Sequence, residues 1–150
     1  MLGLGHFTNS RMLVWPSARR EALNPRLGRD VVLHEFSHKL DMLDGTLDGT
    51  PPIVEPALRQ RWVEVCTAEY QAVRAGAPSL LRPYAGTNPS EFFAVATETF
   101  FTRPVVMAET KPALYEVLAG FYRQDPAARV HAATRAVVDA APTTGAPDAR

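Results

Sequence analysis

The chain has 150 residues, of which 46% are hydrophobic and 21% charged, as expected of one small globular domain. Sixteen basic residues balance sixteen acidic ones, so the net charge predicts neither a direct nucleic-acid partner nor a membrane surface. No apolar run approaches the roughly 20 residues that span a bilayer, and the first residues do not read as a signal peptide. Cys66 is the only cysteine, which favours a reducing, cytoplasmic setting.

The first predicted elements are a short strand and a capped helix. The segment Arg11–Trp15 is apolar and is stopped by Pro16, which is typical of a strand at a sheet edge. Asp30 is placed to cap a helix over Val31–Met42. The glycines and prolines between Gly45 and Pro56 predict a loop after that helix.

The rest of the chain is predicted to be helical. Apolar residues recur at helical spacing from Leu58 to Val73, and Gly76 is placed to end that helix. Three more helices are expected over Pro89–Phe101, Pro112–Arg123 and Pro126–Val138, the first of them closed by Pro104. The sequence therefore predicts a mainly helical α+β domain over residues 1–140 and a flexible tail over residues 141–150.

The stretch HEFSH contains the residues with the clearest chemistry. His34 and His38 are four residues apart, so on a helix their imidazoles lie on one face and can bind one metal ion. Glu35 projects beside them, where a carboxylate can reach an attacking water without ligating the metal. The alternative is a solvated helix face that carries these residues by chance. The apolar residues that precede His34 favour the metal site.

A catalytic zinc ion needs a third protein ligand. Asp44 follows His34 by ten residues, but the turn between them has Asp41 where a glycine would be needed, which makes Asp44 an unfavourable choice. Glu91 and Glu98 are seven residues apart on one face of a predicted helix. With Asn88 as the N-cap, Glu91 falls at the third helical position and could instead cap its own helix, and a carboxylate at position 98 would need a buried partner. Spacing alone leaves the choice between these two glutamates open.

Several other polar residues have simpler interpretations. Asp44 and Asp48, with their glycines, lack the ligand spacing of a calcium loop and indicate turns. Cys66 lies on an apolar helix face and is expected in the core. His131 is expected to be a helix-packing or surface histidine.

Two segments, VVLHEFSHKLDMLDGTLDGTPP and YAGTNPSEFFAVATETFF, resemble the Mlc titration factor A family of gluzincin-type zinc metallopeptidases. The resemblance covers the chain from about Gly28 to His131 and extends well beyond the HEFSH stretch. The catalytic domain of anthrax lethal factor is similar at a greater distance. Family members carry a further N-terminal region, so the resemblance implies that this chain is the C-terminal, zincin-like catalytic part of a longer architecture.

The resemblance implies a role for each residue of the site. His34, His38 and Glu91 would hold one Zn²⁺ ion, and Glu35 would be the general base. Tyr84 matches the tyrosine that assists at the transition state. Glu98 would then bond a ligand histidine or anchor the helix that carries it. Asp41 is a further candidate to support a ligand histidine, with a helix-end or salt-bridge role as its alternative.

These roles predict hydrolysis of a peptide or protein substrate, near its N-terminus if the aminopeptidase-like activity of the family applies. The family is also described as binding the transcriptional repressor Mlc, which makes a repressor of that type a second expected partner. The alternative function is a zinc-stabilised module that captures a transcription factor and has weak or vestigial peptidase activity. Glu35 and Tyr84 favour the enzyme, because a structural zinc is normally closed by four protein ligands and needs neither.

Overall fold

The structure, a computed structural model, describes residues 30–141 of the chain. Within that range the backbone forms helices and no strand. The predicted strand over Arg11–Trp15 lies outside the described residues, as does nearly all of the predicted tail. The elements in chain order are α2 (Val31–Asp41), the 3₁₀ helix η2 (Met42–Asp44), α3 (Pro56–Arg74), the 3₁₀ helix η3 (Pro83–Gly86), α4 (Pro89–Thr102), α5 (Pro104–Thr110), α6 (Pro112–Tyr122) and α7 (Pro126–Asp139).

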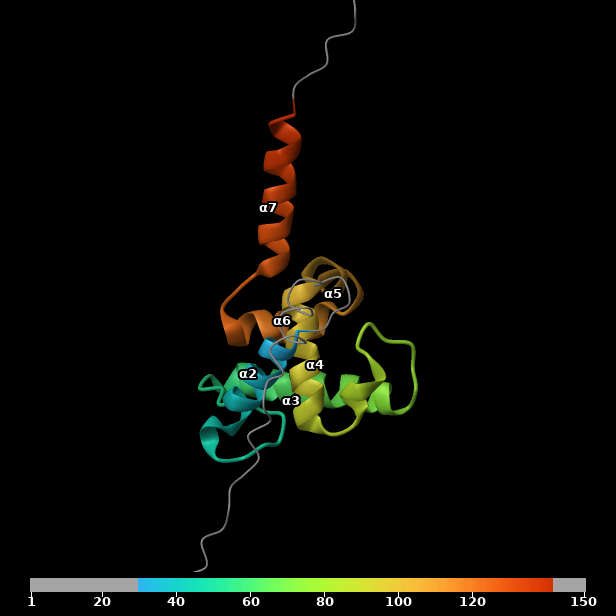
Figure 1. The fold of residues 1–150 in the computed structure, drawn as a ribbon. Coiled ribbons are helices and arrows are strands. Elements are labelled where there is room, and N and C mark those ends of the chain that lie inside the picture. The colour runs from blue at the N-terminus through green and yellow to red at the C-terminus, as the bar shows by residue number, and fades with distance from the viewer. Residues whose placement is uncertain (1–29, 142–150) are drawn as a thin grey trace, which may run out of the picture.

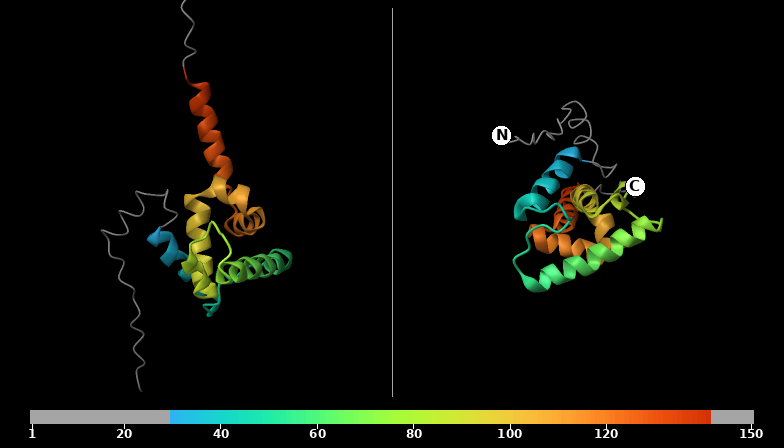
Figure 2. Two further views of the ribbon diagram at one scale, coloured as in Figure 1. Left: turned by 90° about the vertical axis from the view of Figure 1, so that its right-hand side faces the viewer. Right: turned by 90° about the horizontal axis from the view of Figure 1, so that it is seen from below.

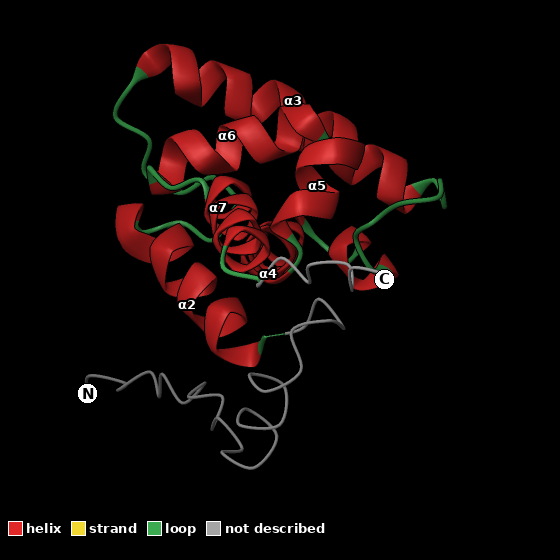
Figure 3. Ribbon diagram, turned by 90° about the horizontal axis from the view of Figure 1, so that it is seen from above, coloured by secondary structure: helices red, strands yellow, loops and turns green. Residues whose placement is uncertain are grey.

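Helix α4 lies at the centre of the molecule (Figure 1), with α2 on one side of it and α3 and α6 on the other (Figure 3). It packs against α2, η3, α3, α5 and α6. Every residue from Ser90 to Phe100 is buried, so this helix has no solvent face along most of its length. A helix that is apolar nearly all round is expected in a core, and polar residues on it must find partners there.

Local signals place the ends of the predicted helices correctly to within two residues. Asp30 Oδ1 accepts hydrogen bonds from the backbone N–H groups of Val32 and Leu33, at 3.0 and 3.1 Å, and so caps α2 as predicted. After the C-terminal end of α3, Gly76 adopts the left-handed conformation with φ +75°, which is favourable only for glycine.

Five of the six α-helices between residues 30 and 141 begin at a proline, whose fixed φ suits the first helical position. Pro104 closes α4 as predicted, one residue beyond the C-cap Arg103, but it also begins α5, a helix that the sequence analysis did not anticipate. Helix α5 has only seven residues and ends just before Pro112. Two prolines so close together resemble a loop in the sequence, although each of them starts a helix.

Aromatic side chains join α3, α4 and α6 into one core. The Trp62 ring on α3 meets Phe93 and Phe121 edge-on, with ring centroids 5.4 and 5.5 Å apart. The indole N–H of Trp62 donates to the backbone carbonyl of Gly49 at 3.3 Å, so the loop after α2 is tied to the same core. This packing fixes the position of α4 relative to α2.

Helix α7 projects away from the other helices (Figure 1, Figure 2). Its buried residues are Pro126 and Ala127, and its contacts are mainly with α5. Between residues 30 and 141 no helix combines the length and the apolar character needed to cross a bilayer.

Candidate metal centre

The two histidines of α2 lie one turn apart and face α4. His34 is buried and His38 is half-buried, and their ring centroids are 4.8 Å apart with the rings nearly perpendicular. Residues i and i+4 of a helix share a face, so this geometry follows from the spacing of the two histidines. Their Nε2 atoms point toward the same acidic side chain of α4.

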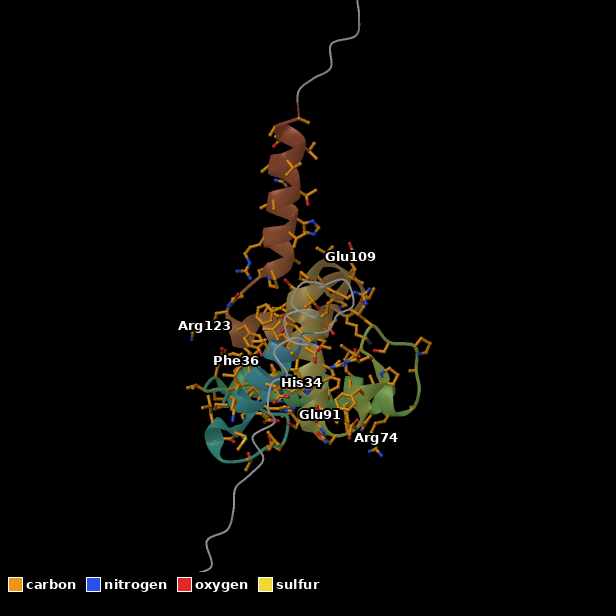
Figure 4. All side chains as sticks on the ribbon, viewed as in Figure 1. His34, Phe36, Arg74, Glu91, Glu109 and Arg123 are labelled. Carbon is orange, nitrogen blue, oxygen red and sulfur yellow. The ribbon has the colours of Figure 1, made fainter. Side chains whose placement is uncertain are left out.

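Glu91 meets both histidines from the first turn of α4. Figure 4 shows Glu91 close to His34. Its Oε2 lies 2.9 Å from His34 Nε2 and 3.4 Å from His38 Nε2. Asn88 caps α4 by accepting the Glu91 backbone N–H at 2.9 Å, as predicted. One ligand atom from each of His34, His38 and Glu91 lies within 4.8 Å of the others, and together they form a candidate metal site.

Glu98 contacts the opposite nitrogen of His34. Its Oε1 is 2.5 Å from His34 Nδ1 and 2.6 Å from an Nη atom of Arg82, while its Oε2 accepts the backbone N–H of Asp30 at 3.1 Å. Glu98 is 1% exposed, so these partners replace the water that its carboxylate gives up. The structure therefore places Glu91 at the Nε2 side of His34 and Glu98 at the Nδ1 side.

The surroundings of His34 change its affinity for protons. Burial lowers the pKa of His34, but the hydrogen bond and charge of Glu98 and the charge of Glu91 outweigh burial and the positive charge of Arg82. The pKa is raised above its ordinary value as a net result. Because a metal binds only neutral imidazole, protons and a metal ion compete for this site.

His38 is held from behind by a serine that the sequence analysis did not single out. His38 Nδ1 lies 2.9 Å from the hydroxyl oxygen of Ser90, the residue before Glu91. Asp41, at the end of α2, is fully buried and accepts the Gly49 backbone N–H with both carboxylate oxygens, at 3.0 and 2.9 Å. Asp41 thus lies close to the site and orders the loop that leaves it.

Tyr84 lies close to His34 in space, and Glu35 is its neighbour along the chain. Glu35 is half-buried on α2, adjacent in sequence to His34. Tyr84 is in η3, with its ring centroid 6.1 Å from that of His34 and 41% of its surface exposed. Arg82, which the sequence analysis also missed, places its guanidinium carbon 5.4 Å from the Tyr84 ring centroid and thereby links Tyr84 to Glu98.

Other residues considered from the sequence lie outside the metal group. Asp44 and Asp48 are exposed, and each accepts the backbone N–H two residues later, from Thr46 at 3.0 Å and from Thr50 at 2.9 Å. Turn chemistry therefore accounts for both aspartates, as predicted. Burial raises the pKa of the Cys66 thiol to about 12, and His131 is exposed on α7.

Comparison with known proteins identifies the family. A family model described as glucose-regulated metallo-peptidase M90 matches residues 2–123. An uncharacterized protein of Synechocystis sp. is 36% identical over 119 residues, which cover 77% of this chain and 43% of that protein. Proteins named Mlc titration factor A from Edwardsiella ictaluri and Serratia proteamaculans are 38% and 39% identical over 113 residues, 69% of this chain and 42% of each relative.

The chain thus spans about two fifths of the length of these relatives. The predicted resemblance to Mlc titration factor A is confirmed, while the more distant likeness to lethal factor stays a prediction. Because the family match includes α2, η3 and α4, it covers each residue of the candidate site. The chain belongs to the glucose-regulated metallo-peptidase M90 family.

Proposed function

We propose that this chain is the catalytic part of a zinc-dependent peptidase, with His34, His38 and Glu91 as the metal ligands. The observation that carries the proposal is the convergence of one atom from each of these side chains, all within 4.8 Å of one another. Two imidazoles and one carboxylate are the ligand set of several zinc peptidases, in which the remaining position is left for water or substrate. Membership of a metallo-peptidase family supports the same reading.

The hydrogen bonds around the histidines fit a metal ion. Glu98 and Ser90 engage the Nδ1 atoms of His34 and His38, so both Nε2 atoms are left to face Glu91. Ligand histidines in metalloproteins are commonly fixed through their second nitrogen in this way. The chemistry of the donor atoms therefore suits zinc, which accepts imidazole nitrogen and carboxylate oxygen.

Zinc in such a site supplies Lewis-acid polarisation of a peptide carbonyl and of the attacking water. Glu35, half-buried beside His34, would accept the proton of that water and deliver it to the leaving amine. The phenol of Tyr84 would donate a hydrogen bond to the oxyanion that develops on the carbonyl oxygen. Tyr84 is 41% exposed, which leaves its ring accessible to a substrate.

The proposed substrate is a peptide or protein cleaved near its N-terminus, as the aminopeptidase-like activity implied by the resemblance predicts. The reaction needs only water as a co-reactant. We place the activity in the cytoplasm, as the single cysteine predicts.

The role of Glu35 is tested with Glu35→Gln, measuring zinc content by mass spectrometry and hydrolysis of a peptide library. Zinc should stay near one ion per chain, while hydrolysis should fall about 10²–10⁴-fold because the general base is lost. Glu109→Gln, the same change on the exposed face of α5, is the matched control and should leave both measurements unchanged. Full activity of Glu35→Gln would exclude this mechanism.

The third ligand is tested by comparing Glu91→Ala with Glu98→Ala. Glu91→Ala removes an atom of the convergent group and should abolish stoichiometric zinc binding. Glu98→Ala removes the partner of His34 Nδ1 and should weaken zinc binding by about 10–100-fold without abolishing it. If the two variants exchanged these results, Glu98 would be the ligand.

A second candidate function is capture of a transcriptional repressor, favoured by the name Mlc titration factor that several relatives carry. Both functions keep the zinc ligands, and only the peptidase needs Glu35 and Tyr84. Binding of purified Mlc to the wild type and to Glu35→Gln separates them. Equal binding by both proteins, together with no peptidase activity in either, would favour the binding module.

A further inference from the structure

The two histidines of the candidate metal centre are supported in different ways. His34 Nδ1 contacts the Glu98 carboxylate directly, at 2.5 Å. His38 Nδ1 contacts a neutral group, the hydroxyl of Ser90, at 2.9 Å. Ser90 is 5% exposed and lies in the first turn of α4, immediately before Glu91. Because Ser90 is neutral, any charged group that supports His38 must lie on the far side of the Ser90 hydroxyl.

The hydroxyl of Ser90 leads to Asp41. The Asp41 carboxylate is fully buried, accepts the Gly49 backbone N–H and lies within hydrogen-bonding reach of the Ser90 hydroxyl. Burial raises the pKa of Asp41, and the hydrogen bonds from Gly49 and Ser90 oppose that rise by stabilising the charged form. A hydrogen bond thus joins His38 to Ser90, and the buried carboxylate of Asp41 lies within reach of the same hydroxyl.

The number of hydrogens that these three side chains carry decides which of them donate and which accept. A serine hydroxyl carries one hydrogen, and a carboxylate can only accept. If Ser90 donates to Asp41, its oxygen must accept from the second neighbour, His38. The hydrogen of neutral His38 is then on Nδ1, which leaves the lone pair of Nε2 for a metal ion facing Glu91.

We propose that Ser90 and Asp41 are positioning residues that hold His38 in the tautomer required for metal binding. The inference rests on the metal centre proposed above and extends it to Ser90, whose side chain has no titratable group. Asp41 acts on His38 through the Ser90 hydroxyl. Its effect on the ligand His38 is the one that a carboxylate bonded directly to a ligand histidine has.

The backbone near Ser90 and Asp41 leaves these two side chains little room to shift. Gly49, which donates to Asp41, has φ +81°, and a Cβ atom at this position would lie 2.3 Å from the Pro89 carbonyl oxygen. The loop after α2 therefore lies directly against the first turn of α4. That turn supplies both Ser90 and the ligand Glu91, so one contact between the loop and the turn sets the position of both.

Zinc affinity, measured by competition with a chromogenic chelator on the full chain, tests the proposal. Ser90→Ala should weaken zinc binding by about 10–100-fold, the usual effect of losing an outer partner of a ligand histidine. Ser90→Thr keeps the hydroxyl and should restore most of the affinity. Ser37→Ala is the matched control, because Ser37 is equally buried on α2 but donates to the backbone carbonyl of His34. It should leave the zinc affinity unchanged.

A double-mutant cycle and NMR distinguish positioning from a general loss of structure. If Asp41 acts through Ser90, Asp41→Asn combined with Ser90→Ala should weaken zinc binding no more than the stronger single change. In the zinc-free wild type, long-range ¹H–¹⁵N spectra should place the hydrogen of neutral His38 on Nδ1. This measurement needs no variant and stays decisive even if Ser90→Ala does not fold.

The possible failures can be told apart. A wild-type chain that binds no zinc would overturn the metal centre itself. A wild-type chain that binds zinc, together with equal affinity in Ser90→Ala, would overturn only the role of Ser90. A wild-type His38 with its hydrogen on Nε2 in the zinc-free state would do the same.

Discussion

Helices α4 and α7 have the same length and similar beginnings but opposite surroundings. Each has 14 residues, a proline at its start and a side-chain cap, Asn88 for α4 and Asp125 for α7. Yet α4 is buried from Ser90 to Phe100, while α7 projects into solvent. The comparison shows that capping signals decide where a helix begins, and that the distribution of apolar residues decides whether it is held in place.

The contrast matters because ionisable side chains are buried on α4 and exposed on α7. Glu91 and Glu98 on α4 are buried, and their contacts with His34 are set by the packing of α4 against α2. His131 on α7 is exposed. A functional group needs a rigid support to keep its geometry, and of these two helices only α4 provides it.

The largest expected effect is on stability, from emptying the core beside α4. Phe100 is fully buried and packs on the rings of Tyr115 and Tyr122, with centroids 5.1 and 5.7 Å away. Phe100→Ala should lower the free energy of unfolding by about 3–5 kcal/mol. Val137→Ala on α7, where the side chain is 71% exposed, should change it by less than about 0.5 kcal/mol. Similar denaturant midpoints for the two variants would contradict the comparison.

A second pair of variants tests how α4 is positioned. Gly45 and Gly49 both have positive φ, +89° and +81°, but a Cβ atom at position 45 meets nothing within 4 Å, whereas one at position 49 would lie 2.3 Å from the Pro89 carbonyl oxygen. Gly45→Ala should cost about 1–2 kcal/mol for its backbone conformation alone. Gly49→Ala should cost more and should also weaken zinc binding, because it displaces the turn that carries Ser90 and Glu91.

Thermal unfolding and chelator competition on both variants measure these effects. Gly45→Ala should keep the zinc affinity of the wild type, since its cost is confined to the exposed end of η2. Equal losses of zinc affinity in both variants would mean that the loop acts on the site by some route other than the contact with Pro89.

A smaller effect is expected from Arg82, whose Nη atom is 2.6 Å from Glu98 Oε1. Arg82→Met removes a charged hydrogen bond from a carboxylate that is 1% exposed. Because 27% of the Arg82 side chain reaches solvent, we expect a loss of about 1–2 kcal/mol, below the range for fully buried pairs. Arg135→Met, the same change on the exposed surface of α7, should leave the unfolding midpoint unchanged. Equal unfolding midpoints for the two variants would mean that the contact between Arg82 and Glu98 does not stabilise the fold.

The sequence was sufficient for much of the fold and for half of the candidate site. Caps such as Asp30 and Asn88 and the apolar spacing located the long helices, because these signals act within one turn. The seven-residue α5 was missed because it is too short to show a helical period between two prolines. His34 and His38 were found because four residues of helix bring them together.

The remaining site residues depend on how α2 meets α4. Glu91 and Glu98 are equivalent by spacing, and only the packing of the two helices decides which faces Nε2 of His34 and which faces Nδ1. Ser90 is 52 residues from its partner His38, and its hydroxyl carries no signal until the helices are packed. Without tertiary contacts, a serine in the first turn of a helix is indistinguishable from an ordinary residue of that turn.

The smallest expected effect is a change in α7 at low pH that leaves α4 intact. Asp125 Oδ1 accepts hydrogen bonds from the Tyr115 hydroxyl at 2.6 Å and from the Ala128 backbone N–H at 3.0 Å, and these bonds lower the pKa of Asp125 below its ordinary value of 3.8. The stabilisation is therefore present above pH 3.8 and is lost as the pH falls through the lower pKa of the folded state. Hydrogen exchange should show the first turn of α7 losing protection in that range before α4 does. Asp125→Asn should remove this difference in pH dependence, and simultaneous loss of protection in both helices would mean that α7 is held by more than its cap.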